Sequence, residues 1–192
     1  MAKVFVITGP SGVGKGTLIS RLLERVADLE LSVSATTREP REGEIDGRDY
    51  HFLTPAEFEA RMEADDFLEF ATYSGNRYGT LRSEVERSLA GGRSVVLEIE
   101  VQGAQQVRAA EPDSVQIFIA PPRAEDLRQR LEGRGTDSEE AIGARLETAE
   151  LELAAQGDFD HRIVNDDLER AAGELEGIVR AELGLPLDSG AE

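Results

Sequence analysis

The sequence predicts an α/β fold in which a parallel β-sheet is covered by helices on both faces. Short apolar runs rich in β-branched residues alternate along the chain with segments whose apolar residues recur at helical spacing. The apolar runs are continuous, as expected of strands that are buried on both faces. A glycine-rich turn joins the first run to the first helical segment, and 192 residues are enough for one sizeable core with inserted lobes.

This first glycine-rich turn has the pattern of a phosphate-binding loop. A buried strand is predicted at Val4–Ile7 and a helix from near Lys15. The spacing Gly9-x-x-x-x-Gly14-Lys15 is that of the Walker A loop, in which backbone N–H groups, a helix N-terminus and a lysine face the phosphates. The usual Ser or Thr after the lysine is Gly16 here, so we expect Mg²⁺ to be held mainly through water. The phosphates are expected to contact Gly9, Pro10, Ser11, Gly12, Val13, Gly14, Lys15, Gly16 and Thr17.

The composition is that of a globular protein, with 40% hydrophobic and 31% charged residues. No apolar run approaches the length of a membrane span, and the N-terminus lacks the form of a signal peptide. Cysteine is absent, so no disulfide bond can form. We therefore expect a cytoplasmic protein that is not inserted in a membrane. The two histidines, His51 and His161, are too few for a zinc site of the usual kind. The net charge of −18 argues against nucleic-acid binding, because a polyanion requires a basic face.

The first helix is predicted to end near Asp28, and the pattern predicts a small β-rich lobe at residues 32–80, inserted after this first strand–helix unit. The alternating stretch Leu31–Ala35 is predicted as a strand, and the polar stretch 36–49 as a loop. Thr54 and Glu57 form a capping-box pattern that begins a helix. The other predicted elements are a strand at 50–53, a hairpin of 67–73 and 77–79 that turns at 74–76, and a helix at 81–90.

The second half of the chain alternates strands with helices. Strands are predicted at 94–100, 115–120 and 159–164. Helices are predicted at 102–110 and 168–183. Between them, a helical segment passes through Leu127 and Leu131 and is broken by Gly133-Arg134-Gly135. A long helix follows, which is capped by Thr136 and Glu139 and reaches about Leu153.

Two arginines and two tyrosines suggest a second anion site. Arg38 and Arg41 lie three residues apart in a predicted loop, with Tyr50 and Tyr78 in nearby strands. Guanidinium groups bind phosphate bidentately, and phenol hydroxyls can complete its shell. The alternative is two solvated arginines, which is the usual environment of this residue and is favoured on the residues alone.

Three glutamates stand in predicted strands or at their ends. Glu69 interrupts the apolar run 67–70, so it either faces solvent on the polar side of an alternating strand or contacts a ligand. Glu98 and Glu100 share one face at the end of a buried strand, where carboxylates suit Mg²⁺ or ligand binding beside Lys15. An exposed strand end is the alternative.

Seven motifs, taken in order, carry a resemblance to a known family. They are Gly9-Pro10-Ser11-Gly12-Val13-Gly14-Lys15, Ser34-Ala35-Thr36-Thr37-Arg38-x-Pro40-Arg41-x-Gly43-Glu44, Gly47-Arg48-Asp49-Tyr50-x-Phe52, Ser74-Gly75-Asn76-x-Tyr78-Gly79, Gln102-Gly103, Leu131-Glu132-Gly133-Arg134-Gly135-Thr136 and Ile163-Val164-Asn165-Asp166-Asp167. Together they resemble the guanylate kinase family from Phe5 to about Leu168. The resemblance implies one domain: a P-loop kinase core at 1–31, 89–120 and 151–184, an inserted β-rich GMP-binding lobe at 32–88, a helical lid at 121–150 and a frayed tail at 185–192.

The resemblance also implies an activity, the direct transfer of the ATP γ-phosphoryl group to GMP. Mg²⁺ would accompany ATP through phosphates and water, with no direct protein ligand assigned. ATP would be held by residues 9–17 and Asn165, and the residues implied for the transfer are Lys15, Arg38, Arg130, Arg134 and Arg145. The residues implied for GMP are Ser34, Arg38, Arg41, Glu44, Tyr50, Glu69, Tyr78, Thr80, Glu98 and Glu100. The family more often has serine at position 80 and commonly has aspartate at position 100.

Two other functions are consistent with parts of the sequence. One is a P-loop kinase for another small molecule, such as ribose 1,5-bisphosphate; Glu69, with Ser34 and Thr80, argues against it, because guanine offers adjacent N–H donors and a sugar needs no such acceptor. The other is a non-catalytic guanylate-kinase-like binding module, which the presence of Lys15 disfavours. ATP and GMP are the expected partners, and the sequence leaves open whether the chain is a monomer or a homo-oligomer.

Overall fold

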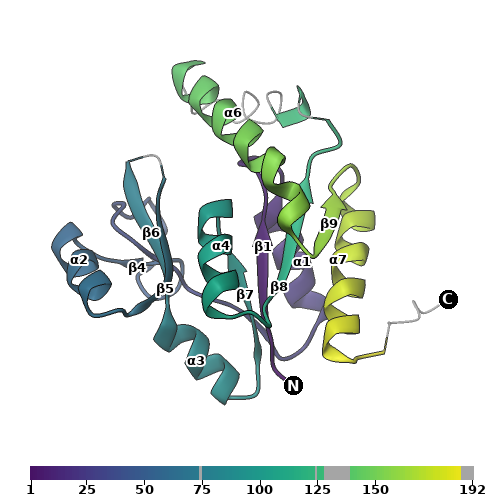
Figure 1. The fold of residues 1–192 in the computed structure, drawn as a ribbon, viewed down its shortest axis with the longest axis horizontal. Coiled ribbons are helices and arrows are strands. Elements are labelled where there is room, and N and C mark those ends of the chain that lie inside the picture. Colours follow the sequence, from purple (N-terminus) through teal and green to yellow (C-terminus); the bar gives the residue numbers. More distant parts are fainter. Residues whose placement is uncertain (74, 124, 128–138, 187–192) are drawn as a thin grey trace.

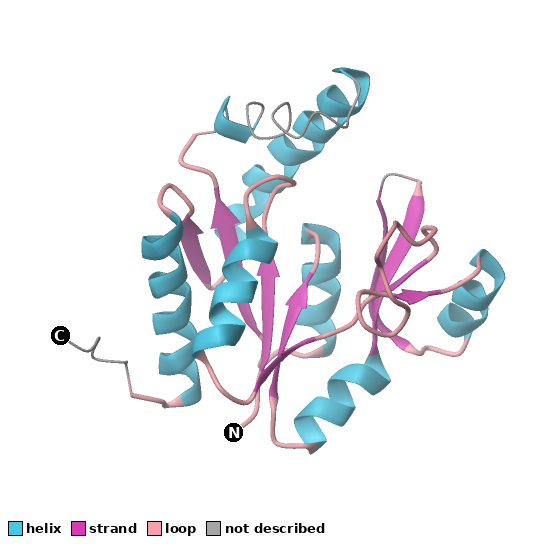
Figure 2. Cartoon of the chain, turned by 180° about the vertical axis from the view of Figure 1, so that it is seen from behind, coloured by secondary structure: helices cyan, strands magenta, loops and turns pink. Residues whose placement is uncertain are grey.

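The computed structural model describes residues 1–73, 75–123, 125–127 and 139–186. It confirms the predicted fold class, because helices flank a parallel sheet on both faces (Figures 1 and 2). A second, smaller sheet lies to one side of the first. Within the described ranges, no helix is long and apolar enough to cross a membrane.

The larger sheet has five strands in the order β2-β7-β1-β8-β9, and every neighbouring pair is parallel. Because parallel strands run in one direction, their carboxyl ends meet at one edge, where ligands of open α/β sheets bind. The strands are β1 (Val4–Thr8), β2 (Leu29–Leu31), β7 (Ser94–Glu98), β8 (Val115–Ala120) and β9 (His161–Val164).

Alternate residues of β1 divide the core between the two faces of this sheet. Phe5 and Ile7 pack with residues of α1 (Lys15–Arg25) and α7 (Leu168–Leu183). Val4 and Val6 pack on the opposite face with residues of α3 (Arg82–Ala90) and α4 (Val101–Ala110). This two-residue period explains why the strand is continuously apolar.

The smaller sheet has four strands in the order β4-β3-β6-β5. They are β3 (Ala35–Thr36), β4 (His51–Phe52), β5 (Phe67–Tyr73) and β6 (Asn76–Leu81), of which β5 and β6 form the predicted hairpin. Helix α2 (Pro55–Glu63) begins at the predicted capping box. Its Phe58 stacks on Phe67 with ring centroids 4.4 Å apart, which gives this sheet a core of its own.

The predicted single strand Leu31–Ala35 is wrong. Leu31 ends β2 in the larger sheet, whereas Ala35 begins β3 in the smaller one. Between them, the Ser32 N–H donates to the Val96 carbonyl oxygen (2.9 Å), and the Ser34 carbonyl accepts from His51 (2.9 Å). The alternating pattern is real, but the chain crosses from one sheet to the other within it.

Smaller differences concern the ends of elements. Helix α1 ends at Arg25 rather than near Asp28, which has a left-handed backbone (φ 60°). Strand β7 ends at Glu98, because Glu100 already caps α4. The remaining elements are α6 (Glu139–Ala154) and a 3₁₀ turn (Ala155–Asp158). The predicted break at 133–135 and the cap at Thr136 lie outside the described residues.

Candidate active site

The loop between β1 and α1 requires glycine at two positions. Gly9 has φ 151°, and a Cβ there would lie 2.2 Å from the Ile119 carbonyl oxygen. Gly14 has φ 100°, and its Cβ would lie 2.7 Å from Nδ2 of Asn165. Both conformations disfavour L side chains, and at both sites the space is already filled. The loop is therefore a backbone structure held against β8 and the residue that follows β9.

Lys15 lies at the first turn of α1 and is 9% exposed. Its ammonium group donates to the carbonyl oxygen of Gly9, at the opposite end of the same loop. The first turn of α1 contains no acidic residue, and no side chain caps it. Its backbone N–H groups, the helix dipole and the lysine thus form a site suited to an anion.

Asn165 supports this loop from behind. Its side-chain amide donates to the Val13 carbonyl oxygen at 2.8 Å, and its backbone N–H donates to Ala120 at the same distance. The side chain is buried and does not belong to the cavity lining described next. The contact of Asn165 with ATP stays a prediction.

A cavity of about 510 Å³ lies between the phosphate loop and the smaller sheet. This is the size of a small-molecule site. Of the residues expected from sequence, it is lined by Pro10, Ser11, Gly12, Val13, Gly14, Lys15, Gly16, Thr17, Ser34, Tyr50, Glu69, Tyr78, Glu98 and Glu100. Sequence reasoning missed Leu31, Ser32, Asp49, Ala71, Tyr73, Gly79 and Ile99, which also line it. The described candidates that do not line it are Gly9, Arg38, Arg41, Glu44, Thr80, Arg145 and Asn165.

Glu69 does not face solvent. The β5–β6 pairing shifts register between Phe67 and Glu69, so the two-residue period breaks there. The Glu69 side chain is only 4% exposed, and its Oε1 accepts a hydrogen bond of 2.8 Å from the Thr80 hydroxyl. Burial raises the pKa of Glu69 to about 7, against the opposing effect of the Thr80 hydrogen bonds. A buried carboxyl at the cavity wall suits a ligand that donates hydrogen bonds.

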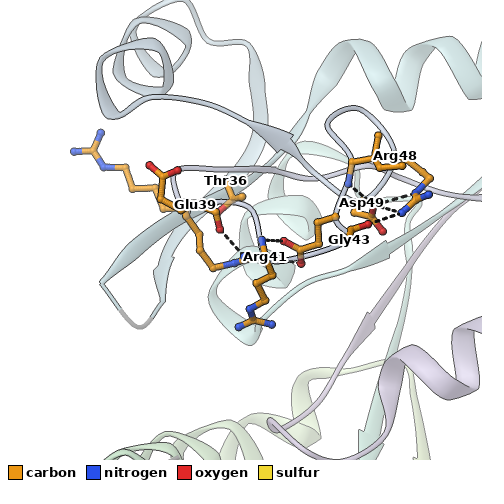
Figure 3. Close-up of polar contacts among 10 residues, drawn as sticks. Thr36, Glu39, Arg41, Gly43, Arg48 and Asp49 are labelled. Atoms are coloured by element: carbon orange, nitrogen blue, oxygen red, sulfur yellow. Dashed lines mark hydrogen bonds and ion pairs between the residues drawn. The ribbon is translucent and has the colours of Figure 1, made fainter. Parts of the chain in front are cut away.

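Glu44 holds Arg38 and the backbone of Arg41 together in one loop. Its Oε1 accepts from Arg38 Nη2 at 2.9 Å, and its Oε2 accepts from the Arg41 N–H at 2.7 Å. The hydrogen bond to Glu44 raises the pKa of Arg38, and that same bond lowers the pKa of Glu44. Figure 3 shows this loop, with Arg41 near the ion pair of Arg48 and Asp49. Glu44 thus orients an arginine, and its own contact with GMP stays a prediction.

Two tyrosines stand between this loop and the cavity. The Arg38 guanidinium lies 5.3 Å from the centroid of the Tyr50 ring, and the Tyr50 and Tyr78 rings meet edge to face at 6.1 Å. Burial raises the pKa of Tyr50, so its hydroxyl stays a hydrogen-bond donor at neutral pH. Tyrosine hydroxyls and arginine therefore lie together beside the cavity, as a phosphate site requires.

Three interacting carboxyl groups, those of Glu98, Glu100 and Glu152, lie near Lys15. The Glu98 carboxylate is 3.8 Å from the position that a Cβ of Gly16 would take. The side chain is exposed, yet desolvation of its carboxyl raises the pKa of Glu98 against the opposing charge of Lys15. Glu152 of α6 is the third and is buried. Burial, with the hydrogen bond and charge of Glu100, raises the pKa of Glu152 to about 9.

Glu152 predicts how stability depends on pH. Its pKa rises from an ordinary 4.5 to about 9 on folding, so the stability that its protonation contributes is complete below pH 4.5 and is lost as pH rises through 9. Glu152→Gln cannot ionise, yet its amide can still donate to Glu100. We expect the fall in Tm between about pH 6 and pH 9 to be smaller for this variant than for wild type by about 3 °C or more. The control is Glu150→Gln, an exposed position on the same helix. Equal dependence of Tm on pH for all three proteins would contradict the raised pKa of Glu152.

The arginines expected in the lid are only partly described. Arg145 lies half-buried on α6, and its positive charge acts on the hydroxyl of Tyr73, a residue of the cavity wall. Arg130 and Arg134 lie outside the described residues. In the described part of the chain, no group of three or more Asp, Glu, His or Cys residues could hold a metal ion.

The glycine loop at the end of β1, the helix that follows it and the cavity beside them define a P-loop kinase. The family model described as guanylate kinase matches residues 1–182. The chain belongs to the guanylate kinase family.

Individual relatives agree over almost the whole chain. A guanylate kinase of Parasynechococcus marenigrum (strain WH8102) is 54% identical over 179 residues, which is 93% of this chain and 98% of the relative. One of Rubrobacter xylanophilus is 53% identical and covers 93% of both chains. The crystal structure of guanylate kinase from Anaplasma phagocytophilum has a TM-score of 0.78 and 35% identity, with 94% of this chain and 86% of that chain covered.

Proposed function

We propose that the chain catalyses ATP + GMP ⇌ ADP + GDP in the cavity between the phosphate loop and the smaller sheet. The observation that carries this is the position of Glu69, a buried carboxyl in the wall of the same cavity that Lys15 and the phosphate loop line. One end of the cavity thus suits phosphates, and the other suits a base that donates hydrogen bonds. The proposal is supported by family membership, and it makes the chain a transferase of purine nucleotide metabolism.

GMP would enter with its base toward Glu69. Guanine offers N1–H and N2–H₂ side by side, which match the two oxygens of a carboxylate, whereas adenine has a bare acceptor at N1. Ser34 lines the same wall, and Thr80 already holds Glu69. The GMP phosphate would then meet Tyr50 and Tyr78 directly, with Arg38 and Arg41 turning in from the adjoining loop.

The transfer needs no covalent enzyme intermediate. A GMP phosphate oxygen attacks the γ-phosphorus in line; the bond from this phosphorus to the β–γ bridging oxygen breaks, and its electron pair stays on ADP. The protein positions the two nucleotides and neutralises the charge that develops. We assign this to Lys15, which exchanges its contact with Gly9 for the phosphates, and to the arginines Arg38, Arg130, Arg134 and Arg145.

The residues near the loop fit a Mg²⁺ ion that arrives with ATP. The Glu98 carboxylate lies beside Gly16, and the hydroxyl of Thr17 is in the same cavity wall. Both would hold waters of the ion, since Gly16 supplies no hydroxyl of its own. When bound, Mg²⁺ would offset charge on the phosphates.

We assign residues 32–88 to a GMP-binding lobe, 121–150 to a lid and the remainder through 184 to the core. Closure of the lobe and lid over the cavity would exclude water, which otherwise competes with GMP for the γ-phosphoryl group. ATP and GMP are metabolites of the cytoplasm, so we place the chain there, without nucleic-acid or membrane partners.

A coupled assay tests the function directly. ADP formation would be followed in separate reactions with ATP and Mg²⁺ plus GMP, AMP or ribose 1,5-bisphosphate. We expect rapid turnover with GMP, a kcat/KM for AMP lower by about 10⁴, and no turnover with the sugar. Preference for the sugar would indicate the other kinase class, and binding of nucleotides without turnover would indicate a binding module.

A further inference from the structure

The pair Gln102-Gly103 is one of the motifs that resemble the family, but the proposed reaction gives it no role. Gly103 lies buried in the first turn of α4, within the range of backbone angles that every residue adopts. Glycine is unfavourable inside a helix, so this position needs a reason other than backbone conformation.

The reason is space. A Cβ at Gly103 would lie 2.3 Å from Oε2 of Glu69 and 3.0 Å from its Cδ. The next neighbour, Cδ1 of Ile99, would be at an ordinary 3.4 Å. The single steric conflict is therefore with the carboxyl that we assign to guanine.

The carboxyl cannot move away from such a clash without disturbing its hydrogen bond to Thr80. Its Oε1 is held by the Thr80 hydroxyl at 2.8 Å, and it is 4% exposed. The backbone beside it is also fixed to α4, because Gln106 Nε2 donates to the Phe70 carbonyl oxygen (2.8 Å) and Gln106 Oε1 accepts from the Phe70 N–H (3.2 Å). Strand β5 is the edge of its sheet, so α4 takes the place of a neighbouring strand there.

We propose that Gly103 is a positioning residue for base selection: the missing side chain lets Glu69 lie against α4 with its carboxylate facing the guanine N–H groups. This rests on the proposed role of Glu69. A methyl group at position 103 pushes the carboxyl by about 1 Å, and such a displacement costs about 10²-fold in rate. The loss falls on GMP, because AMP does not use the acceptor and ATP binds at the other end of the cavity.

The experiment compares wild type with Gly103→Ala, Glu69→Asp and the double variant. Glu69→Asp shortens the side chain by one methylene and so leaves room for the methyl group. Gly173→Ala is the control, since this glycine is also helical and a Cβ there meets nothing within 4 Å. kcat/KM would be measured for GMP and AMP, with KM for ATP and Tm for each protein.

We expect Gly103→Ala to lower kcat/KM for GMP by about 10²-fold, with kcat/KM for AMP, KM for ATP and Tm near wild type. Glu69→Asp also narrows the GMP/AMP ratio. Adding Gly103→Ala to Glu69→Asp then changes that ratio by less than about threefold, because the clash has been removed. Gly173→Ala leaves all kinetic values unchanged.

Three results would overturn the inference. If Gly103→Ala keeps the wild-type ratio of kcat/KM for GMP to that for AMP while Glu69→Asp lowers it, Glu69 selects the base without a contribution from Gly103. If Gly103→Ala lowers GMP and AMP turnover and Tm together, the glycine serves packing alone. If Glu69→Asp leaves the ratio unchanged, the proposed role of Glu69 fails, and with it the role of Gly103.

Discussion

Replacing Lys15 with methionine is expected to lower kcat by about 10³ or more while the protein stays folded. The ammonium group would neutralise charge on the β- and γ-phosphates in the transition state, and methionine keeps a similar length without charge. In the structure the group donates to a backbone carbonyl of its own loop and interacts with Glu98 and Glu152, whose raised pKa values let them take up a proton when the charge of Lys15 is lost. Steady-state kinetics with saturating ATP and GMP, together with Tm, check this result.

Lys3→Met is a matched control, because Lys3 is the other lysine of the sequence. It pairs with Glu182 at 2.7 Å and does not line the cavity, so kcat should stay at the wild-type value. Turnover of Lys15→Met within about tenfold of wild type, against the loss expected for a phosphate-binding cation, would falsify the assignment of the phosphate loop.

The second large effect concerns base selection by Glu69. A polar site built for hydrogen-bond donors rejects a ligand that lacks them by roughly 10⁴. Glu69→Gln keeps the shape of the side chain, but its amide can turn an N–H toward adenine N1. We expect kcat/KM to fall by about 10²-fold or more for GMP and the GMP/AMP ratio to narrow by the same order. Kinetics with both nucleotides provide the measurement.

Glu63→Gln serves as the control, since Glu63 is exposed on α2 of the same β-rich unit. It should leave both values of kcat/KM unchanged. An unaltered GMP/AMP ratio in Glu69→Gln would return the buried carboxyl to a structural role and reopen which phosphorylated acceptor the cavity holds.

The phosphate loop could be read from the sequence because its geometry depends on local residues. A strand, glycines at fixed spacing and a helix determine the backbone path, and strand β8 and helix α7 follow equally local patterns. Their predicted bounds, 115–120 and 168–183, are confirmed.

Features that depend on how strands pair could not be predicted in this way. The alternating pattern at Leu31–Ala35 is the same whether these residues belong to one sheet or to two. No local sequence signal at Ser32–Ser34 indicates that the chain passes from the larger sheet to the smaller one there. Whether Glu69 is buried or exposed depends on a register shift between β5 and β6, so the alternation along β5 alone could not distinguish the two environments. The crossing is set by pairing partners far away in the sequence, and the burial of Glu69 by an irregular register within its own hairpin.

Glu152 interacts with the site residues Lys15 and Glu100, and a local pattern could have indicated that it faces inward. It lies on one helical face with Arg145 and the buried Ala149, at spacings of four and three residues. Gly103 offered a weaker signal, a glycine within a helical pattern. Its reason appears only when the Glu69 carboxyl is placed against it.

The division of the described strands into two sheets has a consequence for the life of the protein in the cell. The smaller sheet has a core centred on Ala35, Phe58, Phe67 and Leu81, far fewer buried residues than the larger one. A small core opens locally at a lower free-energy cost than the whole domain, and opened segments are where proteases cut. Because GMP is proposed to bind this sheet, bound GMP would stabilise its closed form by mass action. We therefore expect the lifetime of the enzyme against proteolysis to increase with the concentration of GMP, its own substrate.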